Sequence, residues 1–413
     1  MERTIRRSIV AGKIRAPPSI AAAHRAIVAS SLAGGQSVLS GMPSSQALDA
    51  TIAACNSFGA DIVAENGVAD IFGAEEIHPP ESVECSGSNT TLKLLLPLAS
   101  LFGQEVEFTG NGQLVKKPLQ AFAGYLERLG AACSTPSGFL PVKVKGPITE
   151  SQLVYSPRLG TQFLSGMLLC SPLRATDTEI GIEGEFSGWE YVKQTIEVMK
   201  KCGIAFSSEE NGYIYLQCSQ QYMPLEDFEI PASPYLASFP ILAGALAGRV
   251  QSQGMPLFEK LQVLLENFGA SASSQEGGFS SSVGALSGIE ISAPKLGALL
   301  PHAMVLASAA SGDTKISAVH SLRRHERSRM RSMMRELSKM GAAFREDGDD
   351  LIISGAKLHG AEIRPEGDAT VAMACSVAAL AAGSPTKIAG AECVSESYSN
   401  FFRDLASLGA IIR

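Results

Sequence analysis

One short segment recurs six times along the chain: an apolar stretch with helical periodicity, a glycine, and then a short alternating strand. The glycines that close the six copies are Gly59, Gly130, Gly203, Gly269, Gly341 and Gly409. By subtraction, successive glycines lie 71, 73, 66, 72 and 68 residues apart. Glycine adopts the left-handed conformation that ends many helices without steric cost. A regular period of this length indicates a repeated supersecondary unit.

A second helix is predicted in every unit. Its six copies are rich in small residues and apolar nearly all round, which is typical of buried helices. They span residues 24–35, 91–104, 161–173, 237–248, 302–313 and 369–383. Strand-like segments follow several of them, for example QEVEFTGNG and TKISAV. We therefore predict an α/β fold of six β-α-β-α-β-β units; chance similarity within ordinary α/β alternation is the alternative.

Composition limits the class of protein. A chain of 413 residues with 45% hydrophobic and 18% charged residues predicts a globular protein of two to three domains. The longest apolar run, 369–383, is too short to cross a bilayer, and the N-terminal segment lacks the apolar stretch of a signal peptide. Eight cysteines without Cys-x-x-Cys pairs indicate a reduced, cytoplasmic protein without a metal site. The net charge of −7 argues against nucleic-acid binding, and no membrane partner is expected.

Three predicted helix starts are rich in small polar residues. Ser19 precedes the helix that carries Arg25, residues 86–90 precede the helix that carries Lys93, and Thr161 and Gln162 open a third. Free backbone N–H groups at helix starts attract anions. Such residues also simply cap helices. Together the three starts favour an anionic ligand.

A basic stretch precedes the fifth repeat helix. It places five arginines and one histidine around a single carboxylate, Glu326: Arg323, Arg324, His325, Arg327, Arg329 and Arg331. Guanidinium groups bind oxyanions in pairs, so this stretch can clamp a phosphate or a carboxylate. A solvated helix face is the alternative. Lys116 and Lys117, ahead of another helix, allow the same two interpretations.

Several segments resemble motifs of one family. APPSIAAAHRA, SNTTLK, LGTQFLSGMLL, LRRHERSR and VSESYSNFF are similar to its APPSKSxTxRA, NSGTTLR, SSQFxSALL, LRxKESDR and VSKSYPxFF. Over residues 1–413 the chain resembles the 5-enolpyruvylshikimate-3-phosphate synthase family of enolpyruvyl transferases. The resemblance implies two domains of three repeats each, residues 1–14 with 229–413 and residues 15–228, and a ligand cleft between them.

The family resemblance also implies a reaction. Its members transfer an enolpyruvyl group from phosphoenolpyruvate to the 5-hydroxyl of shikimate 3-phosphate, releasing phosphate, in the shikimate pathway to aromatic amino acids. Both substrates are small anions, and neither a metal nor an organic cofactor is implied. We expect a cytoplasmic monomer.

Ten residues match functional positions of the family. The resemblance assigns substrate binding to Ser19, Arg25, Lys93, Lys117, Thr161, Gln162, Tyr191 and Arg329, and catalysis to Glu326 and His325. Thr161 replaces a serine, and His325 replaces a lysine. Lys93 and Lys117 replace arginines that bind phosphoenolpyruvate, keeping the charge but losing the bidentate fork.

Other functional positions depart from the family. The resemblance sets these residues against different ones in the family: Ile20 (lysine in the family), Ala21 (serine), Gly87 (asparagine), Asn89 (glycine), Gly188 (serine), Ala298 or, with another gap, Lys295 (aspartate), Ala369 (histidine), Thr370 (arginine) and Glu396 (lysine). Ile20, Thr370 and Glu396 remove three cations, and each lost charge-assisted hydrogen bond is worth about 1.5–3 kcal/mol. These departures support a second hypothesis, a paralogue without the reaction that binds a different ligand or regulates a partner.

Two related classes fit less well. The sugar-nucleotide enolpyruvyl transferases of cell-wall synthesis carry a Lys-Asn pair near the first helix, which this chain lacks. The RNA cyclases with the same repeat are disfavoured by the acidic net charge and by six complete units.

Overall fold

The computed structural model describes residues 1–184, 186, 188–208, 212–275 and 277–413. The chain forms two compact units, one of Met1–Pro17 with Ala232–Arg413 and one of Pro18–Pro231. The resemblance placed these boundaries after residues 14 and 228.

Six four-stranded sheets carry the predicted repeat. In every sheet two strands pair in parallel, and the two remaining strands complete the sheet antiparallel. In four of the six sheets the strands of the parallel pair directly precede and follow a buried helix along the chain. A parallel pair needs a crossover connection, and the buried helix supplies it. The predicted α/β fold of six β-α-β-α-β-β units, three in each compact unit, is confirmed.

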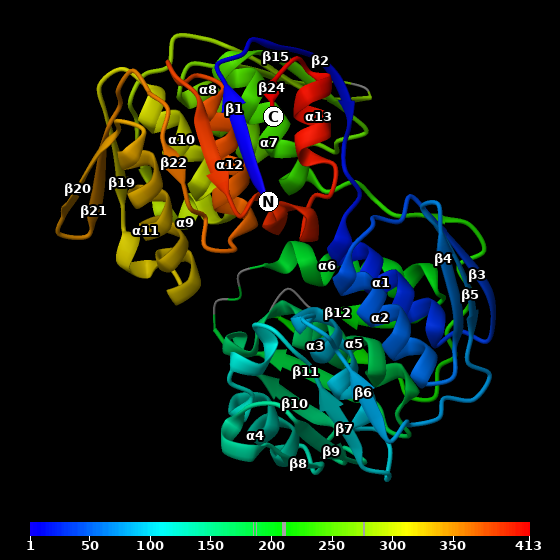
Figure 1. Ribbon diagram of the computed structural model, residues 1–413. Helices are drawn as coiled ribbons and strands as arrows, with labels where there is room; N and C mark the ends of the chain where they lie inside the picture. The colour runs from blue at the N-terminus through cyan, green and yellow to red at the C-terminus, as the bar shows by residue number, and fades with distance from the viewer. Residues whose placement is uncertain (185, 187, 209–211, 276) are drawn as a thin grey trace. The chain divides into compact units, whose positions relative to one another are not determined.

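The unit of residues 18–231 contains three sheets, coloured blue to green in Figure 1. The first has the order β14 (Phe228–Glu229), β3 (Gly35–Ser40), β5 (Val68–Gly73), β4 (Asp61–Glu65). The second has the order β6 (Ser82–Glu84), β7 (Val106–Thr109), β9 (Val142–Lys145), β8 (Ala132–Ser134). The third has the order β10 (Gln152–Tyr155), β11 (Thr178–Ile182), β13 (Tyr213–Leu216), β12 (Phe206–Ser208).

Three buried helices form the centre of this unit and contact one another: α1 (Ile20–Ser31), α3 (Asn89–Ala99) and α5 (Gly160–Cys170). Three amphipathic helices complete the repeats: α2 (Gln46–Ser57), α4 (Gln120–Arg128) and α6 (Trp189–Lys201). The approach of α3 to α5 is close, because a Cβ on Gly166 would stand 2.6 Å from the carbonyl oxygen of Lys93. Small residues therefore allow the tight helix packing that the composition predicted.

The second unit repeats this plan. Its first sheet has the order β22 (Glu362–Ile363), β23 (Thr386–Ala389), β1 (Glu2–Arg6), β24 (Ile411–Ile412). The second has the order β16 (Ser271–Gln275), β17 (Gly278–Ser282), β15 (Gly248–Gln253), β2 (Val10–Arg15). The third has the order β18 (Glu290–Ser292), β19 (Asp313–Ser317), β21 (Asp350–Ser354), β20 (Ala343–Asp347). The central helices are α7 (Pro234–Ala247), α10 (Leu300–Ala309) and α12 (Ala369–Ala379). The outer helices are α8 (Glu259–Asn267), α11 (Arg324–Lys339) and α13 (Phe401–Ser407), and the short α9 (Ala293–Leu296) precedes α10.

Distant parts of the chain complete both units. The α1 repeat takes its first strand, β14, from more than 180 residues downstream, since Phe228 pairs with Leu39. The α7 repeat takes β2 from the N-terminal segment. Beside these exchanges, Ser19 N–H donates to Pro231 O (2.8 Å) and Ser233 N–H donates to Pro17 O (2.7 Å). The α1 and α7 repeats are therefore each completed by a strand from a distant segment, and backbone hydrogen bonds join residues 17–19 to residues 231–233.

The glycines that revealed the repeat have the predicted conformation. All six adopt φ between 77° and 108°, one or two residues beyond the end of a helix. Within the described part of the chain, none of the helices combines the length and hydropathy that crossing a bilayer needs.

Candidate functional site

The ten predicted site residues are divided between the two units. Seven lie in the unit of residues 18–231: Ser19, Arg25, Lys93, Lys117, Thr161, Gln162 and Tyr191. Three lie in the other unit, close together on α11: His325, Glu326 and Arg329.

Lys93 and Lys117 form a cationic pair without a counterion. Lys93, in α3, is half-buried, and its Nζ lies 4.9 Å from the centre of the Phe122 ring. Burial, with a contribution from the Lys117 ammonium, lowers the pKa of Lys93 to about 8, and burial also lowers the pKa of Lys117. Within the described ranges neither lysine has an ion pair. Lys117 is exposed, so desolvation falls mainly on Lys93. A partly desolvated ammonium beside a second cation and without a carboxylate favours binding of an anion.

Asn89 lies on the same face of α3, one turn before Lys93. Its Oδ1 is buried and has no hydrogen-bond partner in the described part of the chain. Ser88 caps the helix, accepting from Thr91 N–H at 3.2 Å. The sequence comparison missed Asn89 because the family carries glycine there. One sequence feature could have indicated Asn89 as a candidate: its side-chain amide stands one helical turn before the candidate Lys93.

Arg25 has an internal position. It is 1% exposed, and its guanidinium donates to Thr195 Oγ1 (2.6 Å), Ala21 O (2.6 Å) and Ser165 Oγ (2.9 Å). Burial lowers the pKa of Arg25 to about 10. Arg25 therefore ties α1 to α5 and α6 through neutral acceptors, and its direct contact with a substrate stays a prediction.

The other predicted residues of this unit lie at helix starts. Thr161 and Gln162 are half-buried in the first turn of α5, and Tyr191 is half-buried in the first turn of α6. Ser19 is buried, and its Oγ accepts from Ala22 N–H at 3.2 Å, so it caps α1 as its position predicted.

Glu326 and His325 stand in the first turn of α11 with different charge states. Glu326 Oε2 accepts from Arg323 N–H at 2.9 Å, and Oε1 accepts from Arg323 Nε at 3.1 Å. Burial raises the pKa of Glu326, but the hydrogen bonds from Arg323 outweigh it and hold the pKa below its ordinary value. Burial, reinforced by Arg323, lowers the pKa of His325. At neutral pH this pair presents a carboxylate, suited to accept a proton, beside a neutral imidazole.

Arg329 is bound to a carboxylate of the neighbouring helix. Its Nε donates to Asp368 Oδ2 at 2.8 Å. The other oxygen of Asp368 caps α12, accepting from Thr370 N–H (2.9 Å) and Val371 N–H (3.2 Å). Burial lowers the pKa of Arg329, but Asp368 more than offsets it, so the pKa is raised. One carboxylate therefore fixes both Arg329 and the start of α12.

Arg329, Asp368 and Thr370 are among the residues that line an open pocket of about 360 Å³. Its walls are Arg329, Glu366, Gly367, Asp368, Ala369, Thr370, Cys393, Glu396 and Ser397. It thus contains one guanidinium and three carboxylates. Thr370, which stands where the family has arginine, lies with its hydroxyl 3.1 Å from Tyr235 Oη. Ala298, which stands where the family has aspartate, is exposed before α10.

Comparisons with known proteins agree on the fold and on the family. The family profile described as EPSP synthase (3-phosphoshikimate 1-carboxyvinyltransferase) matches residues 6–405. The 3-phosphoshikimate 1-carboxyvinyltransferase of Methanocella arvoryzae is 34% identical, over 98% of both chains, and that of Methanocorpusculum labreanum is 31% identical over the whole of both. A solved structure of EPSP synthase from Acinetobacter baumannii has a TM-score of 0.85 over 100% of this chain and 99% of that one. At 22% identity it supports the fold alone.

Proposed function

Because the chain belongs to the EPSP synthase (3-phosphoshikimate 1-carboxyvinyltransferase) family, we propose that it joins phosphoenolpyruvate to shikimate 3-phosphate. The enolpyruvyl group is transferred to the 5-hydroxyl, and inorganic phosphate leaves. The family is one of transferases, and its substrates are small anions. We also propose that the chain works as a cytoplasmic monomer without a cofactor.

The cationic pair of Lys93 and Lys117 carries this proposal. The half-buried Lys93 ammonium is partly desolvated, the exposed Lys117 ammonium repels it, and neither is paired with a carboxylate in the described part of the chain. Partial burial of a cation costs free energy, and an anionic ligand offsets that cost. Asn89 Oδ1, on the same face of α3, adds an acceptor for a ligand hydroxyl or N–H.

Proton transfer is assigned to α11. The 5-hydroxyl must lose its proton as its oxygen bonds to the enol carbon, and an ionised carboxylate can accept that proton. Glu326 has the required charge state, since its pKa is held below the ordinary value. His325, neutral at the same pH, can donate or accept a hydrogen bond beside it. Arg329 supplies the one guanidinium of the pocket.

The test is direct detection of the product. Purified chain is incubated with both substrates, and the enolpyruvyl ether of shikimate 3-phosphate is sought by mass spectrometry. We expect it with the natural sequence and a loss of roughly tenfold or more with K93M, which removes one charge-assisted contact. Absence of the ether at every substrate concentration would contradict the proposal.

A second candidate is binding without transfer. The pocket at Arg329 favours it, because three of the described lining residues are carboxylates and the one guanidinium among them is already bound to Asp368. Such a lining opposes a multiply charged anion. Titration calorimetry separates the candidates: shikimate 3-phosphate binding without any phosphoenolpyruvate binding supports the second.

A further inference from the structure

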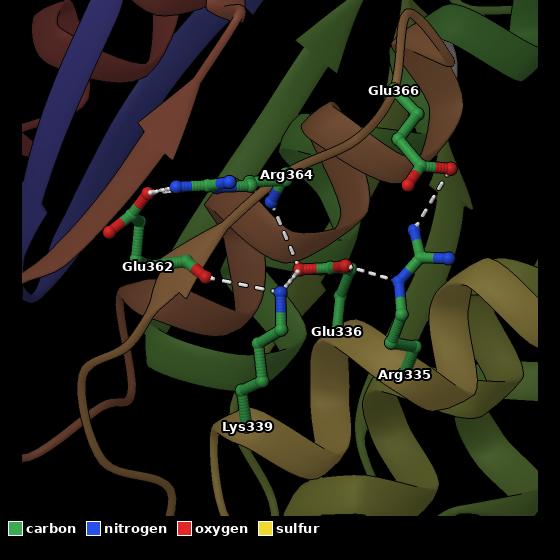
Figure 2. A network of polar contacts seen from close by, with 6 residues as sticks. All are labelled: Arg335, Glu336, Lys339, Glu362, Arg364 and Glu366. Carbon is green, nitrogen blue, oxygen red and sulfur yellow. Dashed lines mark hydrogen bonds and ion pairs between the residues drawn. The ribbon is translucent and has the colours of Figure 1, made fainter.

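Side chains of helix α11 contact the segment that forms one wall of the pocket. Figure 2 shows part of this arrangement, a network of six charged residues: Arg335, Glu336, Lys339, Glu362, Arg364 and Glu366. Four side chains of α11 contact the segment 362–368: Arg329, Arg335, Glu336 and Lys339. That segment runs from β22 to the start of α12 and includes the pocket residues Glu366 and Asp368.

Glu336 is the centre of the network. Its side chain is 0% exposed. One oxygen accepts from Arg335 Nε (2.8 Å), and the other accepts from Lys339 Nζ (2.6 Å) and the backbone N–H of Arg364 (3.0 Å). Burial raises the pKa of Glu336, but these hydrogen bonds from Lys339, Arg335 and Arg364 lower it below the ordinary value. Glu336 is therefore an ionised, buried carboxylate with every contact made by α11 or by the first residue of the loop.

The other charges extend this anchor to the pocket. Arg335, which donates to Glu336, also pairs with Glu366 at 3.3 Å. Arg364, whose backbone is held by Glu336, pairs through its side chain with the exposed Glu362 at 2.8 Å. The network is balanced, with three cations and three carboxylates (Figure 2). Only Glu336 is buried in this network, so removing its charge leaves the cations that contact it without their buried partner.

The loop needs this support. Glu366 adopts φ of 53°, in the left-handed region that residues other than glycine rarely occupy. Two residues later Asp368 must present one oxygen to Arg329 and the other to the N–H groups of α12. A loop with one strained residue keeps such a geometry only when its surroundings fix it.

We propose that Glu336 is a positioning residue for the ligand pocket: by fixing residues 364–368 against α11 it sets the Asp368–Arg329 pair and the pocket wall. Glu336 is not among the lining residues and acts through Arg364 and Arg335. The inference rests on the proposed function only for the identity of the ligand. It predicts that the pocket wall is preformed in the unliganded chain.

Two half-buried thiols allow a test that needs no activity. Cys393 lines the pocket, whereas Cys218 lies in the other unit, and the remaining six cysteines are buried. Modification of both thiols of the full chain by N-ethylmaleimide is followed by peptide mass spectrometry. We expect E336Q to accelerate modification of Cys393 by about tenfold, because a tenfold larger equilibrium constant for local opening exposes the thiol about ten times as often. The modification rate of Cys218 should not change.

The matched control is E362Q. It makes the same substitution in the same network, but Glu362 is exposed and holds only the Arg364 side chain, so the Cys393 rate should stay within about twofold of the natural sequence. If E336Q does not fold, R335Q decides the question. Arg335 is partly exposed, and its loss releases Glu366. R335Q should also accelerate Cys393 selectively.

Two results would overturn the proposal: an unchanged Cys393 rate in E336Q or R335Q, or equal acceleration of Cys393 and Cys218, which would indicate general loosening of the fold. A separate arm addresses the ligand. Phosphoenolpyruvate should slow modification of Cys393 in the natural sequence. If it does not, the proposed ligand of the pocket is wrong, while the comparison of E336Q with E362Q still decides the role of Glu336.

Discussion

The side chain of Thr161 occupies the space that a side chain at Gly188 would need. A Cβ on Gly188 would stand 2.8 Å from the Thr161 methyl group, and Gly188 adopts φ of 99°. The resemblance placed serine of the family at both positions. Two differences from the family that looked independent in the sequence are therefore coupled in the structure. Threonine at position 161 is larger than the family's serine, and glycine at position 188 leaves room for it.

This coupling predicts a non-additive pair of substitutions. G188S alone should lower the free energy of unfolding by about 1–3 kcal/mol, because it overpacks the site and strains the backbone. In the T161S background the cost should be smaller by roughly 0.5–2 kcal/mol, since the methyl group is gone. Urea unfolding of the four proteins gives the coupling. Additive effects would show that the two positions are independent.

Lys93 predicts a pH dependence of anion binding. Its pKa is lowered to about 8, so the ammonium is charged below that pH and neutral above it. Affinity for shikimate 3-phosphate or phosphoenolpyruvate should therefore fall by about tenfold between about pH 7 and about pH 9. Calorimetry at the two values measures it. K93R, whose charge does not titrate there, should remove most of the dependence, and an equal dependence in K93R would assign it to another group.

The acidic pocket predicts that charge reversal strengthens binding. E396K places a cation where the family has lysine, and it should raise affinity for phosphoenolpyruvate by about 1.5–3 kcal/mol. E392K is the matched control, because Glu392 lies in the same short helical segment (Ala391–Glu396) but outside the lining. Competition binding compares the two variants. Equal gains would mean that only the net charge of the surface matters.

Arg25 predicts a structural defect that differs from a binding defect. R25M removes three buried hydrogen bonds, and it should lower the free energy of unfolding by about 2–4 kcal/mol. K93M should change that free energy by less than about 1 kcal/mol while weakening anion binding. Thermal and urea unfolding measure both. A stable R25M chain that has lost ligand affinity would instead place Arg25 in direct contact with the substrate.

The repeat could be predicted because its signals are local. Gly59 and its five equivalents each follow the end of a helix, and the six small-residue helices are apolar nearly all round, so the buried core followed from the pattern. Strand exchange at β2 and β14 depends on pairing between distant segments, which periodicity cannot show. Only the family resemblance indicated where the chain crosses.

The site was predictable only in part, for the same reason. Lys93, Lys117 and Arg329 could be chosen from motifs, because charge and position are visible in the sequence. The hydroxyls around Arg25 and the hydrogen bond from Arg364 N–H to Glu336 are contacts between separate repeats, and the Phe122 ring near Lys93 joins two helices of one repeat. All three are tertiary contacts. Nothing in the sequence distinguishes the buried Glu336 from the exposed glutamates of other outer helices.

The most direct test of the proposed transfer is phosphate release by the purified chain given phosphoenolpyruvate and shikimate 3-phosphate, with each substrate alone as control. Trp189 is half-buried beside Phe186 and two residues before Tyr191, so we expect its fluorescence to report binding in the same samples. We predict release that requires both substrates and that falls in K93M. A fluorescence response to shikimate 3-phosphate without phosphate release would contradict the transfer and leave a binding protein.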